Sequence, residues 1–229
     1  MALAREEILR KVLHVFSGAL IPAVIFYIPH YLERTGTLSN DGVAPWVYPV
    51  IILAIVLAAF LVVEALRLHS PHAGRLFNRF FGSMLRKTEA STATGATYIC
   101  ASALLCSILF RHQPHVAFIA LSTFIWGDGI AAIAGQAFGR IRIGKKSLEG
   151  SLACFGLSVL VMTLLFPALP GLLDSWGGRI SMPVVLLTAA CITIFELIPM
   201  RITPKFVIND NLAVPVITGL VMVWFHQIL

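Results

Sequence analysis

The sequence has little charge. Only 12% of its 229 residues are Asp, Glu, Lys or Arg, whereas 58% are hydrophobic. Soluble domains carry about 25% charged residues, so this chain has too few to cover a water-exposed surface. The composition excludes a soluble enzyme, a disordered chain and a nucleic-acid-binding module, and we expect no nucleic-acid partner. The net charge of +6 instead indicates basic loops on the anionic side of a membrane.

Cysteine is also scarce. The four cysteines lie inside apolar runs, without Cys-x-x-Cys spacing and without a neighbouring His at metal-ligand spacing. We therefore expect Cys100, Cys106, Cys154 and Cys191 to be small, buried, apolar side chains. No small-x-small cleavage site follows the first apolar run, so we expect no cleaved signal peptide.

Long apolar runs dominate what is present. A helix that crosses a bilayer needs about 20 mostly apolar residues. We predict an all-α polytopic membrane protein with seven transmembrane helices, folded as a single domain over residues 1–229. A stop or kink is expected where Pro167 and Pro170 interrupt the fifth run. The runs are residues 14–31, 46–66, 94–110, 116–138, 151–173, 182–200 and 212–228.

The loop charges give an orientation. If seven spans alternate, 14 of the 17 Lys and Arg residues lie on the same side as the N-terminus. Cytosolic loops carry the excess of basic residues in membrane proteins. We therefore predict that the N-terminus is cytosolic and the C-terminus lies outside.

The longest predicted loop, residues 67–93, contains a basic amphipathic pattern. Its apolar residues recur at helical spacing between Arg and Lys residues, which is typical of a helix lying in the lipid headgroup layer. A loop helix packed on the bundle is the alternative. The apolar positions are Leu76, Phe77, Phe80, Phe81 and Met84.

Five acidic residues lie in or at the ends of the predicted spans. Ionisable groups are costly inside a bilayer, so each is a candidate functional residue. In the predicted topology all five lie towards the cytosol. This one-sided placement favours a site that receives a polar cytosolic ligand and a lipid, rather than a transport path. The five are Glu64, Asp128, Glu149, Glu196 and Asp210.

The central motif is WGDGIAAIAGQAFGR, which begins at Trp126. On a helix Asp128, Ala132, Gly135 and Gly139 share one face, because they are spaced by four, three and four residues. A face without bulky side chains lets a ligand or a partner backbone approach closely. Close packing of two helices would explain Gly135 and Gly139. It would explain neither Asp128 nor the two glycines that flank it.

A basic segment follows directly. Cations beside the N-terminus of a helix form an anion site, although the positive-inside rule alone would also place them here. Ser147 is a candidate cap of the next helix, and Glu149 falls in its first turn. Together with Asp128, the arrangement is typical of a polyphosphate held by cations and of carboxylates that bind a divalent metal. The cations are Arg140, Arg142, Lys145 and Lys146.

Other candidate functional residues each have a functional and a structural interpretation. Glu64 and Arg67 have the i, i+3 spacing of an ion pair, with either a functional or a structural role. Asp210, in the sequence Asn-Asp-Asn, is either a functional carboxylate or part of a helix cap. His14 could hold a phosphate or simply lie at the interface, and Glu196 is likewise left open.

These motifs resemble those of the CTP-dependent lipid kinases of the dolichol kinase and phytol kinase family. The string GDGIAAIAGQAFGR…KKSLEGS resembles the central motif of that family. RKVLHVFSGALIP resembles the start of the phytol kinase branch, and DNLAVPVITGL its last helix. Dolichol kinases carry further N-terminal helices, so the resemblance favours the shorter phytol kinase type.

The resemblance implies an integral membrane kinase, with its active site on the cytosolic side, that transfers the γ-phosphate of CTP to a lipid alcohol of the prenol, phytol or polyprenol class. The implied partners are CTP, Mg²⁺ or a similar divalent cation, the lipid alcohol and the bilayer; a homodimer is left open. Asp128 would bind the metal or accept the hydroxyl proton, and Lys145, Lys146 and Arg140 would neutralise the phosphates.

The implied site spans about residues 126–151 and the ends of the chain. The implied catalytic residues are Asp128, Lys145 and Lys146, and the implied metal ligands are Asp128, Glu149 and Asp210. The implied nucleotide-binding residues are Gly127, Gly129, Gly135, Gly139, Arg140, Ser147, Glu149, Gly150, Asp210, Asn211 and His14.

Two other functions are weighed against the kinase. A phosphatidate cytidylyltransferase has a similar Asp and Gly pattern but attacks the α-phosphorus of CTP, and Gly-Asp-Gly with KKSLEG matches the kinase better. A small transporter would suit seven spans, but the one-sided acids argue against it. Phytol, geranylgeraniol, farnesol, a longer polyprenol and diacylglycerol all suit the generic apolar residues of this chain.

Overall fold

A computed structural model describes residues 5–36, 42–82, 85, 87–144, 146–198, 200–203 and 206–228. An α-helix lies in each of the seven predicted spans, which confirms the all-α class. The helices are α1 (Arg5–Thr35), α2 (Val47–His69), α4 (Gly95–Leu109), α5 (Pro114–Phe138), α6 (Leu148–Leu160), α7 (Met182–Leu197) and α8 (Asp210–Ile228).

Four segments of the described chain are long and apolar enough to cross a membrane: α2, α5, α8 and Leu148–Ala168, which begins with α6. Helices α4 and α7 are apolar but shorter. The number of crossings and the cytosolic N-terminus therefore stay predictions.

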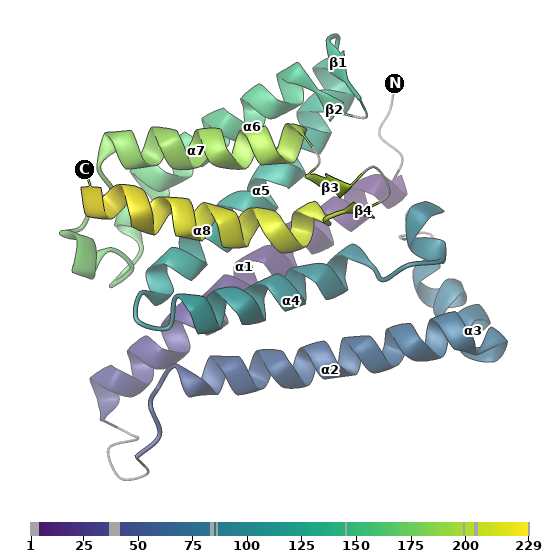
Figure 1. The fold of residues 1–229 in the computed structure, drawn as a ribbon, viewed down its shortest axis with the longest axis horizontal. Helices are drawn as coiled ribbons and strands as arrows, with labels where there is room; N and C mark the ends of the chain where they lie inside the picture. The colour runs from purple at the N-terminus through teal and green to yellow at the C-terminus, as the bar shows by residue number, and fades with distance from the viewer. Residues whose placement is uncertain are drawn as a thin grey trace.

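Helix α5 is the centre of the bundle. It packs against α1, α4, α6, α7 and α8, and α1 and α5 cross behind the row formed by α7, α8, α4 and α2 (Figure 1). Most of α5 is buried, whereas α2 at the edge of the row is largely exposed. Lipid is as apolar as a leucine side chain, so such a bundle depends on close packing rather than on hydrophobic burial.

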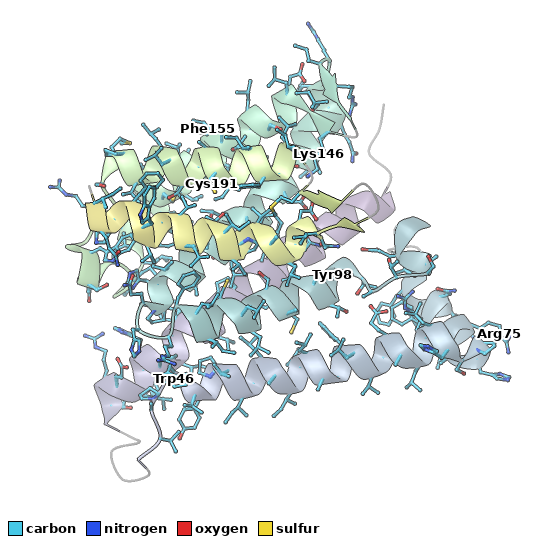
Figure 2. All side chains as sticks on the ribbon, in the orientation of Figure 1. Trp46, Arg75, Tyr98, Lys146, Phe155 and Cys191 are labelled. Atoms are coloured by element: carbon cyan, nitrogen blue, oxygen red, sulfur yellow. The ribbon has the colours of Figure 1, made fainter. Side chains whose placement is uncertain are left out.

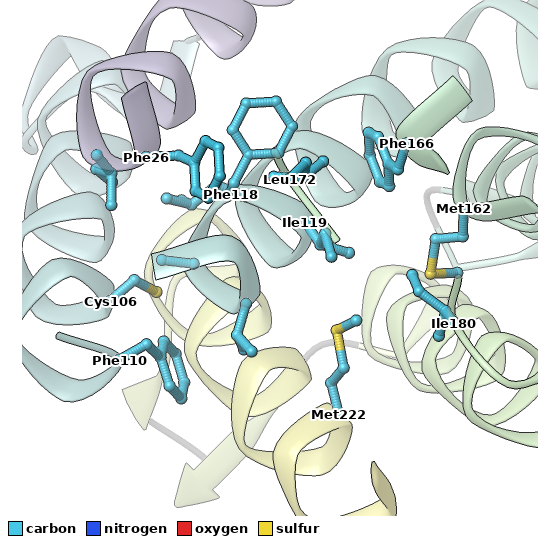
Figure 3. Packing of buried hydrophobic residues seen from close by; sticks show 14 of the residues in the cluster. Phe26, Cys106, Phe110, Phe118, Ile119, Met162, Phe166, Leu172, Ile180 and Met222 are labelled. Carbon is cyan, nitrogen blue, oxygen red and sulfur yellow. The ribbon is translucent and has the colours of Figure 1, made fainter. Parts of the chain in front are cut away.

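Phenylalanine rings pack in the core beside aliphatic and sulfur-containing side chains (Figure 3). The ring of Phe118 on α5 meets the ring of Phe166 edge to face, with centroids 5.8 Å apart. It meets Phe26 of α1 in the same way at 6.1 Å. Edge-to-face pairs place the positive ring edge against the negative ring face, so these contacts fix how α1 and α5 cross.

The fifth predicted span is not one continuous α-helix. Helix α6 ends at Leu160 and continues as the π-turn η3 (Val161–Leu165) and the 3₁₀ turn η4 (Phe166–Ala168). Pro167 lacks a backbone N–H and cannot continue the i to i−4 pattern, so the wider turn precedes it. The expected interruption is confirmed, and it begins at Val161, six residues before the first proline. A further 3₁₀ turn, η5 (Asp174–Trp176), follows.

Two short hairpins were expected to be loops. Strand β1 (Arg142–Ile143) pairs with β2 (Lys146–Ser147), and β3 (Arg201–Thr203) pairs with β4 (Phe206–Val207). Gly144 has φ +62°, a left-handed conformation that glycine adopts without strain and that suits a tight turn. The first hairpin places Lys146 and Ser147 directly before α6.

The longest predicted loop, residues 67–93, contains the expected helix. Helix α3 (Pro71–Phe81) follows α2 and is succeeded by the 3₁₀ turn η2 (Lys87–Ala90). None of the α3 residues is buried. Met84, the last apolar position of the predicted pattern, lies outside the described residues.

A buried ion pair closes the end of α2. The guanidinium of Arg67 contacts the carboxylate of Glu64, with Nε 2.9 Å from Oε2. Glu64 Oε1 accepts hydrogen bonds from the backbone N–H of Thr94 at 2.8 Å and from the hydroxyl of Thr97 at 3.2 Å. Arg67 also donates to the carbonyls of Glu89 and Thr92. The predicted pair is confirmed, and it fastens the loop before α4 to α2.

We predict that Glu64→Gln lowers the stability of the fold by about 3 kcal/mol, because it leaves the guanidinium of Arg67 buried without its counter-charge. The measurement is the thermal unfolding midpoint in detergent micelles. The control is Glu33→Gln, because Glu33 is exposed on α1. Equal midpoints for the two variants would show that the pair adds nothing to stability.

Candidate functional site

Lys146 lies at the meeting point of three segments that are distant in sequence. Its Nζ is 2.7 Å from Oε1 of Glu196, in the last turn of α7, and 3.5 Å from Oδ2 of Asp210, which begins α8. Glu196 is 4% exposed, while the side chains of Lys146 and Asp210 are about one third exposed. Figure 2 shows Lys146 beside the end of α7. The ammonium therefore joins a buried carboxylate to a partly solvated one.

Asp128 adds a third carboxylate to this cluster. It lies half-buried on α5, and its charge acts on Lys146. Burial alone would lower the pKa of Lys146, but Glu196, Asp210 and Asp128 outweigh burial and raise that pKa above its ordinary 10.5. Lys146 is therefore a cation at neutral pH. Lys146 is thus paired with two carboxylates and influenced by the charge of a third, and we call these four residues the Lys146 cluster.

Ser147 caps α6, as the sequence predicted. Its Oγ accepts the backbone N–H of Gly150 at 3.1 Å, which satisfies one of the unpaired donors at the start of the helix. The hydroxyl of Ser151 lies 3.1 Å from the carbonyl of Ser147 and 3.4 Å from Oε2 of Glu196. The cap and the Lys146 cluster are thus joined through Ser151.

The glycine face of α5 packs against the start of α6. A Cβ on Gly135 would lie 2.7 Å from Oγ of Ser147, and a Cβ on Gly150 would lie 2.5 Å from the carbonyl oxygen of Ala131. A Cβ on Gly139 would lie 2.9 Å from Cβ of Ser147. The structure shows a packing role for these glycines, and their binding of nucleotide stays a prediction.

The glycines that flank Asp128 also permit close approach. A Cβ on Gly127 would lie 2.7 Å from Sγ of Cys154 on α6, and one on Gly129 would lie 3.3 Å from a methyl group of Val15 on α1. Asp128 therefore lies where α5 passes closely between two neighbouring helices. Gly127 and Gly129 permit this close approach, because a larger side chain at either position would push the helices apart.

The predicted metal ligands are only partly brought together. Asp128 and Asp210 both act on Lys146, but the carboxylate of Glu149 accepts the backbone N–H of Ile141 at 3.1 and 3.3 Å. Among the described residues no three His, Cys, Asp or Glu side chains form a potential metal-binding group. The metal role of these acids stays a prediction.

The remaining predicted site residues either lie away from the Lys146 cluster or fall outside the residues that the structure describes. Arg140 is exposed beside the first hairpin. Asn211 is buried, and its Nδ2 donates to the carbonyl of Gly95 at 3.4 Å, so it ties α8 to α4. The side chain of His14 and the whole of Lys145 lie outside the described residues.

Glu196 is the residue of the cluster that the sequence listed as a candidate acid but did not assign to the site. It was one of five acids in predicted spans, with no motif around it. The sequence did show a carboxylate near the end of an apolar run. Such a carboxylate is costly inside a membrane unless it has a partner of opposite charge. The structure supplies that partner, Lys146, from 50 residues earlier in the chain.

The α5–α6 contact predicts a contrast between two glycines of α6. We expect Gly150→Ala to lower stability by about 1–3 kcal/mol, because its methyl group would press on the carbonyl of Ala131. Gly156→Ala is the matched control, because a Cβ there meets nothing within 4 Å and alanine favours a helix. Thermal unfolding in detergent measures both variants. A loss in both, or in neither, would contradict the packing described.

Comparisons with known proteins find two groups of relatives. A CTP-dependent diacylglycerol kinase of Saccharomyces cerevisiae is 29% identical over 161 residues, which are 69% of this chain and 50% of that protein. A probable phytol kinase of Triticum aestivum is 28% identical over 225 residues, which are 96% of this chain and 67% of that protein. A probable phytol kinase of Zea mays is 26% identical over a similar span.

The chain thus spans about half the length of the yeast relative and about two thirds of the plant relatives. The resemblance to CTP-dependent lipid kinases is confirmed by these matches. No protein-family model matches the chain, and no solved structure matches it.

Proposed function

We propose that this chain is an integral membrane kinase that transfers the γ-phosphate of CTP to the hydroxyl of a lipid alcohol. The observation that carries the proposal is the Lys146 cluster, in which one partly buried cation pairs with Glu196 and Asp210 and is influenced by the charge of Asp128. The relatives named for diacylglycerol and phytol support it, because both names describe phosphate transfer to a lipid hydroxyl.

Lys146 binds phosphate in this proposal. An ammonium has three N–H donors, and Glu196 and Asp210 accept two of them. The third donor is then directed to a phosphate oxygen of CTP. Lys146 does not leave Glu196 to do so, because a buried carboxylate without its counter-ion costs about 3–5 kcal/mol. Glu196 is therefore a positioning residue.

Asp128 accepts the proton of the lipid hydroxyl. The hydroxyl oxygen forms a bond to the γ-phosphorus, the bond from that phosphorus to the bridging oxygen of CDP breaks, and the products are a lipid phosphate and CDP. The lipid hydroxyl reaches Asp128 from the bilayer, and the phosphates reach it from the aqueous side. Phosphoryl transfer depends mainly on such positioning and on neutralised charge.

A divalent cation fits the acids of the cluster. Mg²⁺ usually takes one or two carboxylates from the protein and its other ligands from phosphates and water. Asp210 would supply one carboxylate, and the cluster keeps an excess of negative charge after Lys146 is counted. When bound, the cation would neutralise charge on the phosphates.

The site is proposed to lie on the cytosolic side, where CTP is available, because an excess of basic residues in the loops favours that orientation. The acceptor is proposed to be a prenol of the phytol or polyprenol class, because the phytol kinases match 96% of this chain and the yeast diacylglycerol kinase matches 69%. Diacylglycerol is the second acceptor to test.

The central test follows two labelled forms of CTP with the purified protein in detergent. Phytol, farnesol and diacylglycerol are offered as acceptors, and phosphatidate is offered separately. With the alcohols, label from the γ-phosphate should enter the lipid, and label from the α-phosphate should remain in CDP. Transfer of the α-label to lipid would establish a cytidylyltransferase. Label in no lipid would contradict the proposal.

Asp128→Asn should lower kcat by about 10²–10⁴-fold, while the exposed Asp174→Asn serves as its control.

Glu196 has a separate prediction. Glu196→Gln should lower kcat/KM for CTP by about tenfold, equivalent to about 1.4 kcal/mol, with little change in KM for the lipid. The carboxylates raise the pKa of Lys146, so removing one should lower that pKa. The alkaline loss of activity should therefore begin at a lower pH than in the parent enzyme.

The pH profile separates positioning from a purely structural role. Glu33→Gln, which is exposed on α1, should keep the parent profile. An unchanged alkaline limb in Glu196→Gln, or an equal rise in both KM values, would contradict the role proposed for Glu196.

A further inference from the structure

Helix α3 begins at the point where α2 ends. Ser70 ends α2 in an extended conformation, and its hydroxyl accepts the backbone N–H of Ala73 as the cap of α3. The 23 residues of α2 span about 35 Å, which exceeds the hydrocarbon thickness of a bilayer of about 30 Å. Helix α3 therefore lies at a membrane surface if α2 crosses the membrane.

One face of α3 is turned to the protein. Phe77 lies beneath the guanidinium of Arg67, with 5.2 Å from Cζ to the ring centroid. A Cβ on Gly74 would lie 3.0 Å from the carbonyl oxygen of Arg67. Arg67 is itself held by Glu64. The rotation of α3 about its own axis is thus set by the end of α2.

That rotation leaves an apolar face and a basic face uncovered. Leu76 and Phe80, four residues apart, are 59% and 67% exposed. Arg75 and Arg79, also four residues apart, form the neighbouring exposed face, and Figure 2 shows Arg75 at the outer end of the bundle. Residues four apart on a helix lie one above the other, so each pair forms a short stripe.

We propose that α3 is a docking surface for anionic lipid. Leu76 and Phe80 enter the boundary between headgroups and acyl chains, and Arg75 and Arg79 contact the anionic headgroups. Paired apolar and basic stripes are typical of helices that lie in this layer. The position of α3 after a long apolar helix favours lipid over a soluble partner. The proposal does not depend on the kinase activity.

The test measures which residues of α3 touch lipid. An environment-sensitive fluorophore is attached to a cysteine at position 80, 76 or 78, in a Cys191→Ala background that leaves only the buried native cysteines. The protein is placed in nanodiscs, one copy per disc, made of phosphatidylcholine with or without phosphatidylserine. Quenching by spin-labelled lipid is compared with quenching by aqueous iodide.

Lipid should quench the labels at positions 80 and 76, and iodide should quench the label at position 78, which replaces the exposed Asn78 on the other side of the helix. Iodide quenching at position 80 that equals the quenching at position 78 would overturn the proposal. Protection of position 80 only in discs with two copies would also overturn it, because the face would then be an interface between two chains.

The charge dependence is tested in the same discs. Each basic side chain near an anionic surface contributes about fivefold to docking. Arg75→Gln with Arg79→Gln should therefore reduce lipid quenching at position 80 in discs that contain phosphatidylserine, but not in neutral discs. The matched control pair, Arg34→Gln with Arg179→Gln, removes two exposed charges elsewhere. Equal losses with both pairs would contradict the specific role of α3.

Discussion

The contact between Lys146 and Glu196 determines how this end of the bundle is arranged. A carboxylate that is 4% exposed needs a counter-charge, and Lys146 supplies it at 2.7 Å. To reach Glu196, the first hairpin must lie against the end of α7, and Ser147 then begins α6 at a fixed place. Because Asp210 also meets Lys146, the start of α8 is drawn to the same point. Three helix ends are thereby held around one ammonium.

Close packing complements this charged contact. Helices α5 and α6 approach through glycines and small side chains, with Gly135 and Gly139 against Ser147 and Gly150 against Ala131. Van der Waals contact of this kind drives helix association where lipid surrounds the protein. Asp128 lies on α5 one to three turns before these contacts, so packing and charge position the same residue. The glycines of the motif thus build the site, whether or not they also touch a ligand.

Local patterns predicted the elements well. Apolar run lengths located the helices, the spacing of Asp128, Gly135 and Gly139 identified a close-packed face, and Ser147 was recognised as a cap. Each depends on residues within a few turns of one another. The Lys146 cluster joins residues 50 and 64 positions apart, and no local pattern shows such a contact. The first hairpin was also missed, because two-residue strands carry no periodicity.

Asn211 links the start of α8 to the start of α4. Its amide meets the carbonyl of Gly95 at the start of α4, one residue beyond Thr94, whose backbone N–H binds Glu64. Asp210, the residue before Asn211, meets Lys146. Helix α2, the outermost helix of the row, and the ammonium of Lys146 are therefore linked by consecutive polar contacts. A tilt of α2, as in a bilayer of different thickness, would be passed through the first turn of α8 to Lys146, the cation proposed to bind phosphate.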